Sequence, residues 1–544
     1  MANIKFSRKE FEKHIKITPK IEEQIHMFGT PLESLTKDEV EIEIFPNRPD
    51  MLSMHGFLRG FLGFLGKQKG LKKYNVKKSG YKLVVDSSLP KEWPYAVACI
   101  VKGIKFDDEK IKEVIDIQEK LGMTMLRKRK KGGIGLYPLE KINFPVKFVG
   151  MDPNKIKFVP LESNREMTGK QILSGHPTGR DYAYICSRWN KFPVFIDDKG
   201  KIMSMPPIIN SHTMGKVDEK TKEVFIEATG PNLNIIKKAL NIIVTALADM
   251  GGEIYSIDCI QQNKKPINIP DLTPEKISIN IKNVNKLLGL DLKETDVKGL
   301  LEKMGYNYNK GEVEIPAWRI DILHEHDIIE DIAIAYGYQN FTPEIPEVAT
   351  IGQEDKTEAT KRKISEILQG LNMLETSSFH LTTPDAQFKK VNKKKENIIE
   401  VEESKTEYSI LRHDLLHYAL KILSENSDAE YPQRIFELGR VFSLDKKSST
   451  GISEKEDLCV CTASPSSNFT EIKQTLDYLM RMLDKNYKIE PTMNSYFIDG
   501  RCGKIIVDEK EIGFIGEICP NILSNLKIKM PVSGFELDIH QIVS

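Results

Sequence analysis

The sequence lacks an excess of charge of either sign. Among its 544 residues, Lys and Arg total 79 and Asp and Glu total 78, which gives a formal charge of +1. A chain so close to neutral has no long-range field that would draw it onto nucleic acid or a membrane. Any contact with RNA must therefore be made by a local group of residues.

Cysteine is scarce, and no long hydrophobic run occurs. The seven cysteines include no Cys-x-x-Cys pair, so we expect neither a zinc ribbon nor the disulfide framework of a secreted protein. The most apolar stretch, residues 57–66, is interrupted by Arg59 and three glycines, whereas a membrane-spanning helix needs about 20 apolar residues. The N-terminus has no apolar signal core. These absences predict a soluble, reduced, cytoplasmic protein without a membrane partner.

What is present is a mixture of helix and strand signals. Ser7 is placed to cap a helix, and residues 40–45 alternate as a strand. The turn 197–200 separates two short strands, and residues 232–250 carry the apolar stripe of a helix. Between these landmarks we expect alternating short strands and helices, among them residues 95–101, 181–186 and 192–196.

The second half continues the mixed pattern after a polar linker at 261–270. A strand is expected at 277–281, and helices at 282–288 and 295–304 are each stopped by a glycine. A length of 544 residues allows several domains of about 100 to 200 residues each. We predict a multidomain α+β protein with domains at residues 1–88, 89–262, 268–343 and 354–544.

Two groups of residues are locally basic. One is the run 127–131, and the other comprises Lys389, Lys390 and residues 393–395. Blocks of one sign are common on solvated surfaces, which is the favoured interpretation of each group; a local RNA contact is the alternative.

An acidic segment follows the strand that ends near Ile315. Asp327, Glu330 and Asp331 share one face of a predicted helix, and Asp321 lies on the preceding turn. Carboxylate oxygens at this spacing can hold Mg²⁺, directly or through water. On the sequence alone, solvated carboxylates favoured by the helix dipole are the better interpretation.

Several phrases resemble one family, the beta subunits of phenylalanyl-tRNA synthetase. Residues 45–53 read Phe-Pro-Asn-Arg-Pro-Asp-Met-Leu-Ser, and residues 316–321 read Pro-x-x-Arg-x-Asp before an acidic helix that ends Ala-Tyr-Gly-Tyr. The phrases at 176–181, 205–211 and 227–230 are similar to the central proofreading domain of the archaeal and eukaryotic form. The resemblance covers nearly the whole chain.

The resemblance implies a fold and partners. It implies a winged-helix-like module at 268–343 and a C-terminal antiparallel sheet of the class II synthetase kind. The phrases 436–440 and 513–517 lack the glycine spacing and the arginine that would hold ATP, and no Gly-x-x-x-x-Gly-Lys loop occurs. Adenylate synthesis from ATP and phenylalanine would then belong to an alpha subunit, in an alpha2-beta2 heterotetramer that binds tRNA(Phe).

The resemblance also implies an editing site, and there is a physical reason why such a site is needed. A pocket built for phenylalanine rejects tyrosine weakly, by about a hundredfold, because tyrosine only adds a hydroxyl. A second hydrolytic pocket would correct the error, and the resemblance assigns it to Ser204, Asn210, Glu227, Thr229 and His176. Glu227 is the predicted acceptor of the phenol proton, and His176 would orient water or the terminal ribose.

Alternatives to this assignment stay open. Without the resemblance, Glu227 reads as an edge-strand charge and Ser204 as a hairpin residue, and His212 has no secure counterpart in the family. The resemblance further assigns magnesium to Asp321, Asp327, Glu330 and Asp331. The alternative function is a noncatalytic scaffold and RNA-binding subunit with a decayed editing cleft.

Overall fold

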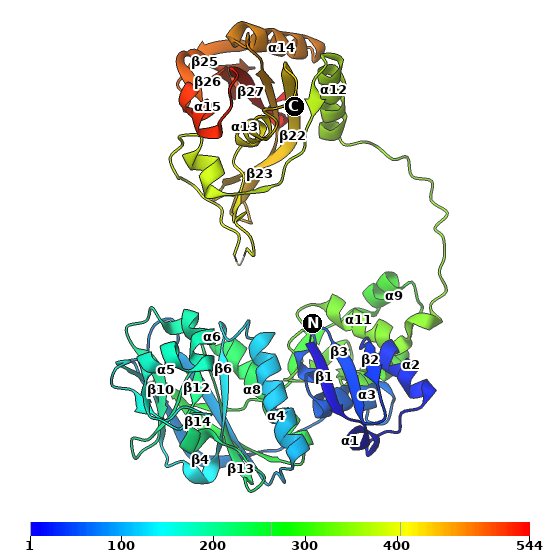
Figure 1. The fold of residues 1–544 in the computed structure, drawn as a ribbon. Coiled ribbons are helices and arrows are strands. Elements are labelled where there is room, and N and C mark those ends of the chain that lie inside the picture. Colours follow the sequence, from blue (N-terminus) through cyan, green and yellow to red (C-terminus); the bar gives the residue numbers. More distant parts are fainter. Residues whose placement is uncertain (1, 263, 403, 544) are drawn as a thin grey trace. The chain divides into compact units, whose positions relative to one another are not determined.

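The structure is a computed structural model that describes residues 2–262, 264–402 and 404–543. The chain divides into two compact units, Met1–Ile345 and Pro346–Ser544 (Figure 1). Each unit mixes helices with sheets, which confirms the predicted multidomain α+β fold. Over the described ranges, no helix combines the length and the apolar character needed to cross a membrane.

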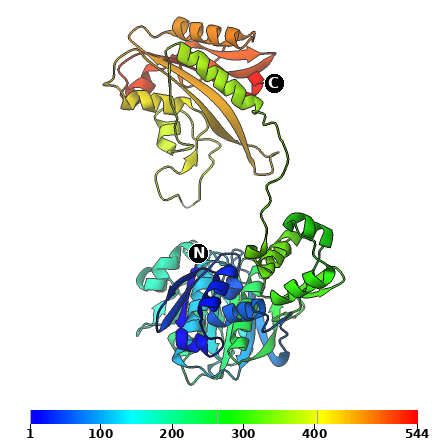
Figure 2. The same cartoon turned by 90° about the vertical axis from the view of Figure 1, so that its right-hand side faces the viewer.

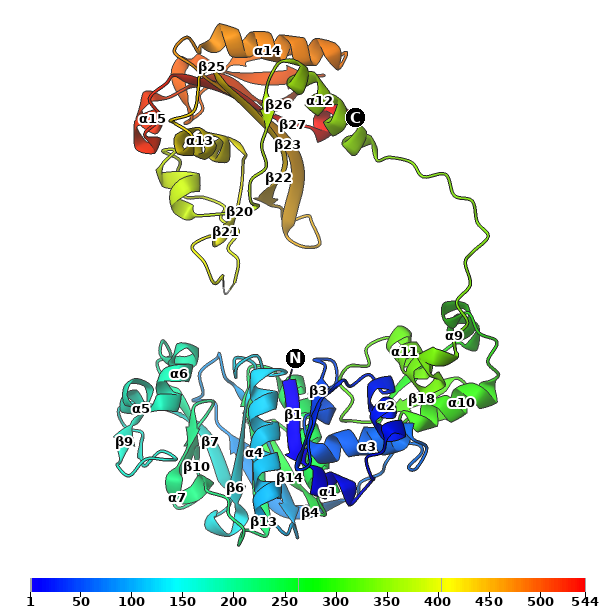
Figure 3. The same cartoon turned by 45° about the vertical axis from the view of Figure 1, so that its right-hand side comes forward.

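The N-terminal module is a small antiparallel sheet covered by a helix (Figure 3). Its strands run in the order β1 (Ala2–Ser7), β3 (Glu39–Ile44), β2 (Leu32–Leu35). As predicted, Ser7 caps a helix, because its hydroxyl accepts the Glu10 N–H at 3.4 Å. Buried phenylalanines of α3 fill the core. The helices are α1 (Arg8–Glu12), α2 (Pro19–Met27), η1 (Pro49–Met51) and α3 (Met54–Phe64).

The central domain is built on a ten-stranded mixed sheet. Its strand order is β12-β11-β10-β7-β4-β14-β5-β13-β6, with β15 paired to β14. The strands are β4 (Val76–Val85), β5 (Tyr95–Lys102), β6 (Gly133–Pro138), β7 (Val146–Met151), β10 (Phe192–Ile196), β11 (Ile202–Met205), β12 (Ile209–Asn210), β13 (Glu223–Gly230), β14 (Glu253–Gln261) and β15 (Ile267–Ile269). Other elements are β8 (Lys157–Phe158), β9 (Met167–Thr168), η2 (Leu139–Lys141), α4 (Asp108–Met123), α5 (Gly169–Gly175), α6 (Pro177–Cys186), α7 (His212–Gly215) and α8 (Leu233–Asp249).

Most local expectations for this domain are confirmed. The hairpin around 197–200, the strands at 95–101 and 192–196 and the amphipathic helix α8 are all present. Residues 181–186 belong to a helix, α6. The prediction of a linker at 261–270 is wrong in part, because β15 pairs with β14 and buries Ile269.

The third part of the first unit carries the acidic helix. Its strands are β16 (Glu275–Ser278), β18 (Glu312–Ile315) and β17 (Asn307–Asn309), and its helices are α9 (Ile281–Leu288), α10 (Glu294–Lys303), α11 (Glu325–Tyr336) and η3 (Tyr338–Asn340). Gly289 and Gly337 end α9 and α11 with φ of +67° and +94°, backbone angles that favour glycine. A Cβ on Gly63 of α3 would lie 2.7 Å from the Lys303 carbonyl oxygen of α10. This close approach packs the acidic-helix module onto the N-terminal module.

The C-terminal unit is a seven-stranded sheet with helices on both faces (Figure 2). The strands follow the order β19 (Leu374–Glu375), β22 (Gln433–Leu444), β23 (Ile452–Ala463), β27 (Val532–Asp538), β26 (Lys510–Ile518), β25 (Phe497–Val507), β24 (Lys488–Pro491), antiparallel except at β19. One face packs on α12 (Lys356–Gly370), α14 (Phe469–Met482) and α16 (His540–Val543), and the other on α13 (Leu416–Glu425) and α15 (Pro520–Leu526). Short elements are β20 (Leu381–Thr382), β21 (Ile410–Leu411) and η4 (Asp385–Lys389).

Candidate functional site

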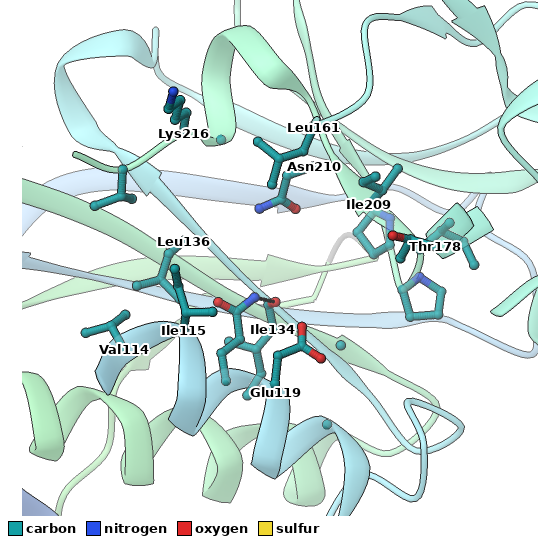
Figure 4. A pocket seen from close by; sticks show the side chains of 18 of the residues that line it. Val114, Ile115, Glu119, Ile134, Leu136, Leu161, Thr178, Ile209, Asn210 and Lys216 are labelled. Carbon is teal, nitrogen blue, oxygen red and sulfur yellow. Dashed lines mark hydrogen bonds between the residues drawn. The ribbon is translucent and has the colours of Figure 1, made fainter. Parts of the chain in front are cut away.

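The central domain encloses a cavity of about 660 Å³ beside helix α4. Figure 4 shows Val114, Ile115 and Glu119 of α4 on one side of the cavity, opposite Leu161 and Asn210. Its walls are mostly apolar, and a few polar groups in an apolar cleft are the usual composition of a small-molecule site.

The two ends of the central sheet meet at this cavity. Strand β6 is at one end of the strand order and β12 at the other. Even so, the Tyr137 hydroxyl of β6 lies 2.7 Å from Ser204 Oγ of β11 and 3.2 Å from Asn210 Oδ1 of β12. The sheet is therefore strongly curled, so that side chains of its two end strands form a hydrogen bond with each other.

Glu227 joins the same group from β13. Its Oε1 lies 3.2 Å from the Tyr137 hydroxyl, which is fully buried. A phenol has one proton, so Tyr137 donates to one of these oxygens at a time and can accept from the Ser204 hydroxyl. The structure thus brings Ser204, Asn210 and Glu227 together, as predicted, around a residue that sequence reasoning missed.

A glycine makes room for this cluster. Gly135 lies opposite Glu227 in the β6–β13 ladder, and a Cβ there would overlap the Glu227 carboxyl and lie 2.6 Å from the Tyr137 hydroxyl. Since side chains alternate along a strand, Gly133, Gly135 and Tyr137 share one face. That alternation was the available signal for Tyr137: two glycines beside a polar aromatic residue indicate space reserved for another side chain.

Burial controls the ionisation of Glu227. Loss of hydration raises its pKa to about 8, although the Tyr137 hydrogen bond acts in the opposite direction. Burial and the neighbouring Glu227 also raise the pKa of Tyr137 well above its usual range. The Glu227 carboxyl is therefore mostly protonated at neutral pH, and a neutral carboxyl can both donate and accept.

One oxygen of Glu227 remains free for a ligand. Glu227 lines the cavity, and among the described residues its Oε2 is buried with no hydrogen-bond partner. A buried polar atom left unpaired is costly. Such an atom at a cavity wall marks the place where a ligand hydroxyl would be recognised.

The remaining predicted residues, Thr229 and His176, do not line the cavity but lie close to residues that do. Thr229 is on the same face of β13 as Glu227, and its buried Oγ1 has no partner in the described chain. His176 does not line the cavity but contacts its wall, with Nε2 3.1 Å from the Leu161 carbonyl oxygen. His212 does line it, and its buried Nδ1 is unpaired within the described residues. His212 is thus a second polar group that the sequence alone did not assign.

The acidic residues near α11 are arranged differently from the prediction. Arg319 donates to both oxygens of Asp321, at 2.9 and 2.7 Å, and to Asp331 Oδ2 at 2.8 Å. Tyr306 donates to the same Asp331 oxygen. Asp327 accepts the N–H groups of residues 323 and 324 at 2.8 Å each, which caps the helix. Glu330 is exposed.

These carboxylates do not fit a magnesium site. Across the described ranges, no group of three or more His, Cys, Asp or Glu side chains lies close enough to hold a metal ion. Two of the four predicted ligands neutralise a buried guanidinium, and a third caps a helix. The predicted set, Asp321, Asp327, Glu330 and Asp331, is therefore not assembled around one point here, because Arg319 binds Asp321 and Asp331 while Asp327 accepts backbone N–H groups.

A second arginine repeats this arrangement in the N-terminal module. Arg48 donates to both oxygens of Asp50 at 2.9 Å, and both side chains are buried. Desolvation opposes ionisation of Asp50, but the positive charges of Arg48 and Arg319 hold its pKa below the usual value. The two proline-arginine phrases noted in the sequence therefore form neighbouring buried ion pairs where their modules pack together.

The C-terminal sheet face is also filled by internal polar contacts. Arg412 is almost fully buried and donates to Glu437 and Ser378 at 2.7 Å each. Glu536 accepts the N–H groups of residues 415 and 416 at 3.0 and 2.9 Å, at the start of α13. Glu536 thus joins the sheet to α13, and Arg412, already bonded to Glu437 and Ser378, is not free to bind phosphate.

Comparison with known proteins gives consistent matches. Residues 342–539 match the family model described as "Phenylalanyl tRNA synthetase beta chain CLM domain", and residues 277–338 match "tRNA synthetase B5 domain". The phenylalanine–tRNA ligase beta subunit of Thermococcus sibiricus is 40% identical over 496 residues, covering 90% of this chain and 88% of that one. The Archaeoglobus fulgidus beta subunit is 37% identical over 524 residues, covering 95% and 94%.

A solved structure resembles the first unit. It is an N-terminal fragment of the phenylalanyl-tRNA synthetase beta subunit from Pyrococcus horikoshii. The match has a TM-score of 0.59 and 36% sequence identity, and it covers 62% of this chain and 99% of the fragment.

Proposed function

Because this chain belongs to the phenylalanine–tRNA ligase beta-subunit family, we propose that its central cavity hydrolyses tyrosyl-tRNA(Phe) formed in error. The observation that carries this proposal is the buried Glu227 carboxyl, which faces the cavity with Oε2 unpaired among the described residues. Charging of tRNA(Phe) with phenylalanine, from ATP, belongs to an alpha subunit in an alpha2-beta2 assembly in the cytoplasm.

The geometry supports discrimination by an unpaired polar atom. A tyrosyl group that enters the apolar cavity can pair its phenol with Glu227, whereas a phenylalanyl group leaves that oxygen buried and unsatisfied. An unsatisfied buried polar group costs about 1 to 3 kcal/mol. The correct product is therefore bound less well than the incorrect one, which is the selectivity that an editing site needs.

The chemistry that the cavity supports is attack by water. Among the described residues that line the cavity, no nucleophile, base and orienting group form a hydrogen-bonded series, so we propose that water is held against the ester by polar atoms such as His212 Nδ1. No step goes through magnesium, since the acidic residues near α11 do not fit a metal site.

One observation favours a second candidate, the noncatalytic scaffold with a decayed cleft. Tyr137 already contacts Ser204, Asn210 and Glu227 Oε1, so much of the predicted pocket is satisfied without a ligand. The deciding experiment is deacylation of tyrosyl-tRNA(Phe) by this chain reconstituted with its alpha partner. Hydrolysis no faster than the spontaneous rate would establish the scaffold instead.

We expect the chain alone to be unable to activate phenylalanine. The sequence lacks an ATP-binding motif, and the buried Arg412 is held by Glu437 and Ser378. Phenylalanine-dependent exchange of pyrophosphate into ATP should stay at background for the purified chain and appear when the alpha partner is added. Exchange by the single chain would show that its C-terminal sheet has an active site after all.

Replacing Tyr137 with phenylalanine should shift the pH dependence of editing. The Tyr137 hydrogen bond lowers the pKa of Glu227, against the larger effect of burial, so its loss raises that pKa further above 8. We expect the inflection of tyrosyl-tRNA hydrolysis near pH 8 to move upward, with a rate loss of a few-fold from a misplaced carboxyl. An unchanged inflection would mean that Tyr137 only fills space.

A further inference from the structure

A basic turn forms part of the rim of the editing cavity. It comprises residues 127–131, Arg-Lys-Arg-Lys-Lys, between helix α4 and strand β6. Gly122 before the turn, Gly133 after it and Arg129 within it all line the cavity. Residues on either side of the turn, and one side chain within it, therefore lie at the cavity wall.

The backbone of the basic turn adopts an unusual conformation. Arg127, Lys128 and Arg129 have φ of +47°, +52° and +62°, a region that residues with a side chain rarely adopt, and here in three consecutive positions. Neighbouring groups hold it there, since the Arg129 N–H donates to the Gly122 carbonyl at 2.9 Å and the Tyr184 hydroxyl of α6 donates to the Lys128 carbonyl at 2.8 Å. A strained segment retained at a cavity rim suggests a functional reason for its shape.

The charges of the turn are divided between two directions. Arg129 points toward the cavity, where it donates to Glu119 at 2.8 Å and to the Ile208 carbonyl at 3.0 Å. Arg127 and Lys128 are exposed, and within the described ranges their side chains have no hydrogen-bond or ion-pair partner. The rim thus carries positive charge that the protein itself does not neutralise.

We infer that Arg127 and Lys128 bind phosphodiester groups of the single-stranded 3′ end of tRNA while its aminoacyl ester occupies the cavity. This inference rests on the proposed function. The cavity walls are mostly apolar, and of the two cations that line them Arg129 is already paired with Glu119, which leaves Lys216. The walls can therefore balance only part of the negative charge that the nucleotides of an attached RNA bring, and the exposed Arg127 and Lys128 of the basic turn would supply more of that balance at the rim. Basic side chains on a phosphate backbone supply affinity rather than sequence recognition.

The test compares two tRNAs with two variants, using the full chain with its alpha partner. One tRNA is intact, and the other lacks its single-stranded 3′ nucleotides. The variant is Arg127→Ala with Lys128→Ala, which keeps a Cβ at each position with positive φ. The matched control is Lys199→Ala with Lys201→Ala, two exposed lysines of the same domain at the β10–β11 turn, outside the cavity lining.

We expect truncation of the tRNA to weaken binding to the wild type and to the lysine control, but hardly to affect the Arg127 and Lys128 variant. For intact tRNA, the variant should bind about fivefold to tenfold more weakly at low salt. The slope of log Kd against log salt concentration should also be smaller by about 1.4, because each of the two lost contacts to a single strand contributes about 0.7. An equal effect of truncation on wild type and variant would overturn the inference.

Hydrolysis separates this inference from the proposed function. In tyrosyl-tRNA deacylation the variant should raise KM with kcat nearly unchanged, because its side chains do not touch the ester. If the wild type hydrolyses tyrosyl-tRNA but the variant matches it in KM and in the truncation test, only the role of the basic turn is wrong. If the wild type does not hydrolyse it, the proposed function fails, and the binding comparison still decides whether the turn contacts the RNA end.

Discussion

Replacing Glu227 with alanine should slow hydrolysis of tyrosyl-tRNA(Phe) by about tenfold to a hundredfold. The substitution leaves the substrate phenol without its partner in an apolar cavity, which costs about 1 to 3 kcal/mol. Charging with phenylalanine should hardly change, because the proposed function assigns that reaction to the alpha partner. Rates of deacylation and of phenylalanine charging, measured side by side on the reconstituted enzyme, check this result.

Glutamine at position 227 is the matched control. It keeps the size of the carboxyl and its hydrogen-bonding capacity but does not titrate. The wild-type enzyme should bind tyrosyl-tRNA more tightly as pH rises through about 8, because an ionised carboxylate accepts from the phenol more strongly than a neutral one. The Glu227→Gln variant should lack this change after spontaneous hydrolysis is subtracted.

Stability gives an independent readout of the same residue. The folded pKa of Glu227 is raised from 4.5 to about 8, so the folded state binds more protons between these values and the free energy of unfolding falls as pH rises through that window. Glu227→Gln should remove this slope.

Two outcomes of the rate measurements would contradict the role of Glu227. If the alanine and glutamine variants both hydrolyse tyrosyl-tRNA at the wild-type rate, the discriminating group lies elsewhere. If they lose phenylalanine charging together with hydrolysis, the substitutions have damaged the fold.

Replacing Arg319 with methionine should lower the free energy of unfolding of the first unit by about 3 to 5 kcal/mol. Arg319 is buried and binds Asp321 and Asp331. Removing one partner of a buried ion pair leaves uncompensated charge in a medium of low polarity, which is why the expected cost is large. Denaturant unfolding followed by tryptophan fluorescence reports this unit, since Trp93, Trp189 and Trp318 all lie in it.

The exposed neighbour Glu330 provides the control for this prediction. Glu330→Gln should change the unfolding free energy by less than about 0.5 kcal/mol, as surface substitutions usually do. Removing divalent cations with a chelator should leave the wild-type unfolding curve unchanged. If the chelator destabilises the protein and Glu330→Gln abolishes that effect, the carboxylates do hold a metal and Arg319 is not their main partner.

Elements whose signals lie within one segment were predicted well. Ser7 caps its helix, glycines 289 and 337 end theirs, and the hairpin at 197–200 forms. Capping and turn formation depend on backbone groups only a few residues away, so the local sequence is enough to predict them. Residues 267–269 have the composition of a linker, but they form a strand, because that strand depends on pairing with β14.

The candidate site was predicted in part. The phrases around Ser204, Asn210 and Glu227 pointed to one pocket, and the structure brings them together. Tyr137 was missed because it meets Ser204 across 67 positions of sequence and between opposite ends of a curled sheet. No local periodicity reports such a contact.

By itself, the sequence determined which chemical groups are available and how they are spaced along each element. It placed three carboxylates on one face of α11 and a glutamate among the strand residues of β13. Only the tertiary structure decided what those groups do, because charge and hydration depend on neighbours in space. A guanidinium from the preceding turn neutralises Asp331. Burial raises the pKa of Glu227 despite the opposing Tyr137 hydrogen bond, and the carboxyl lines the cavity.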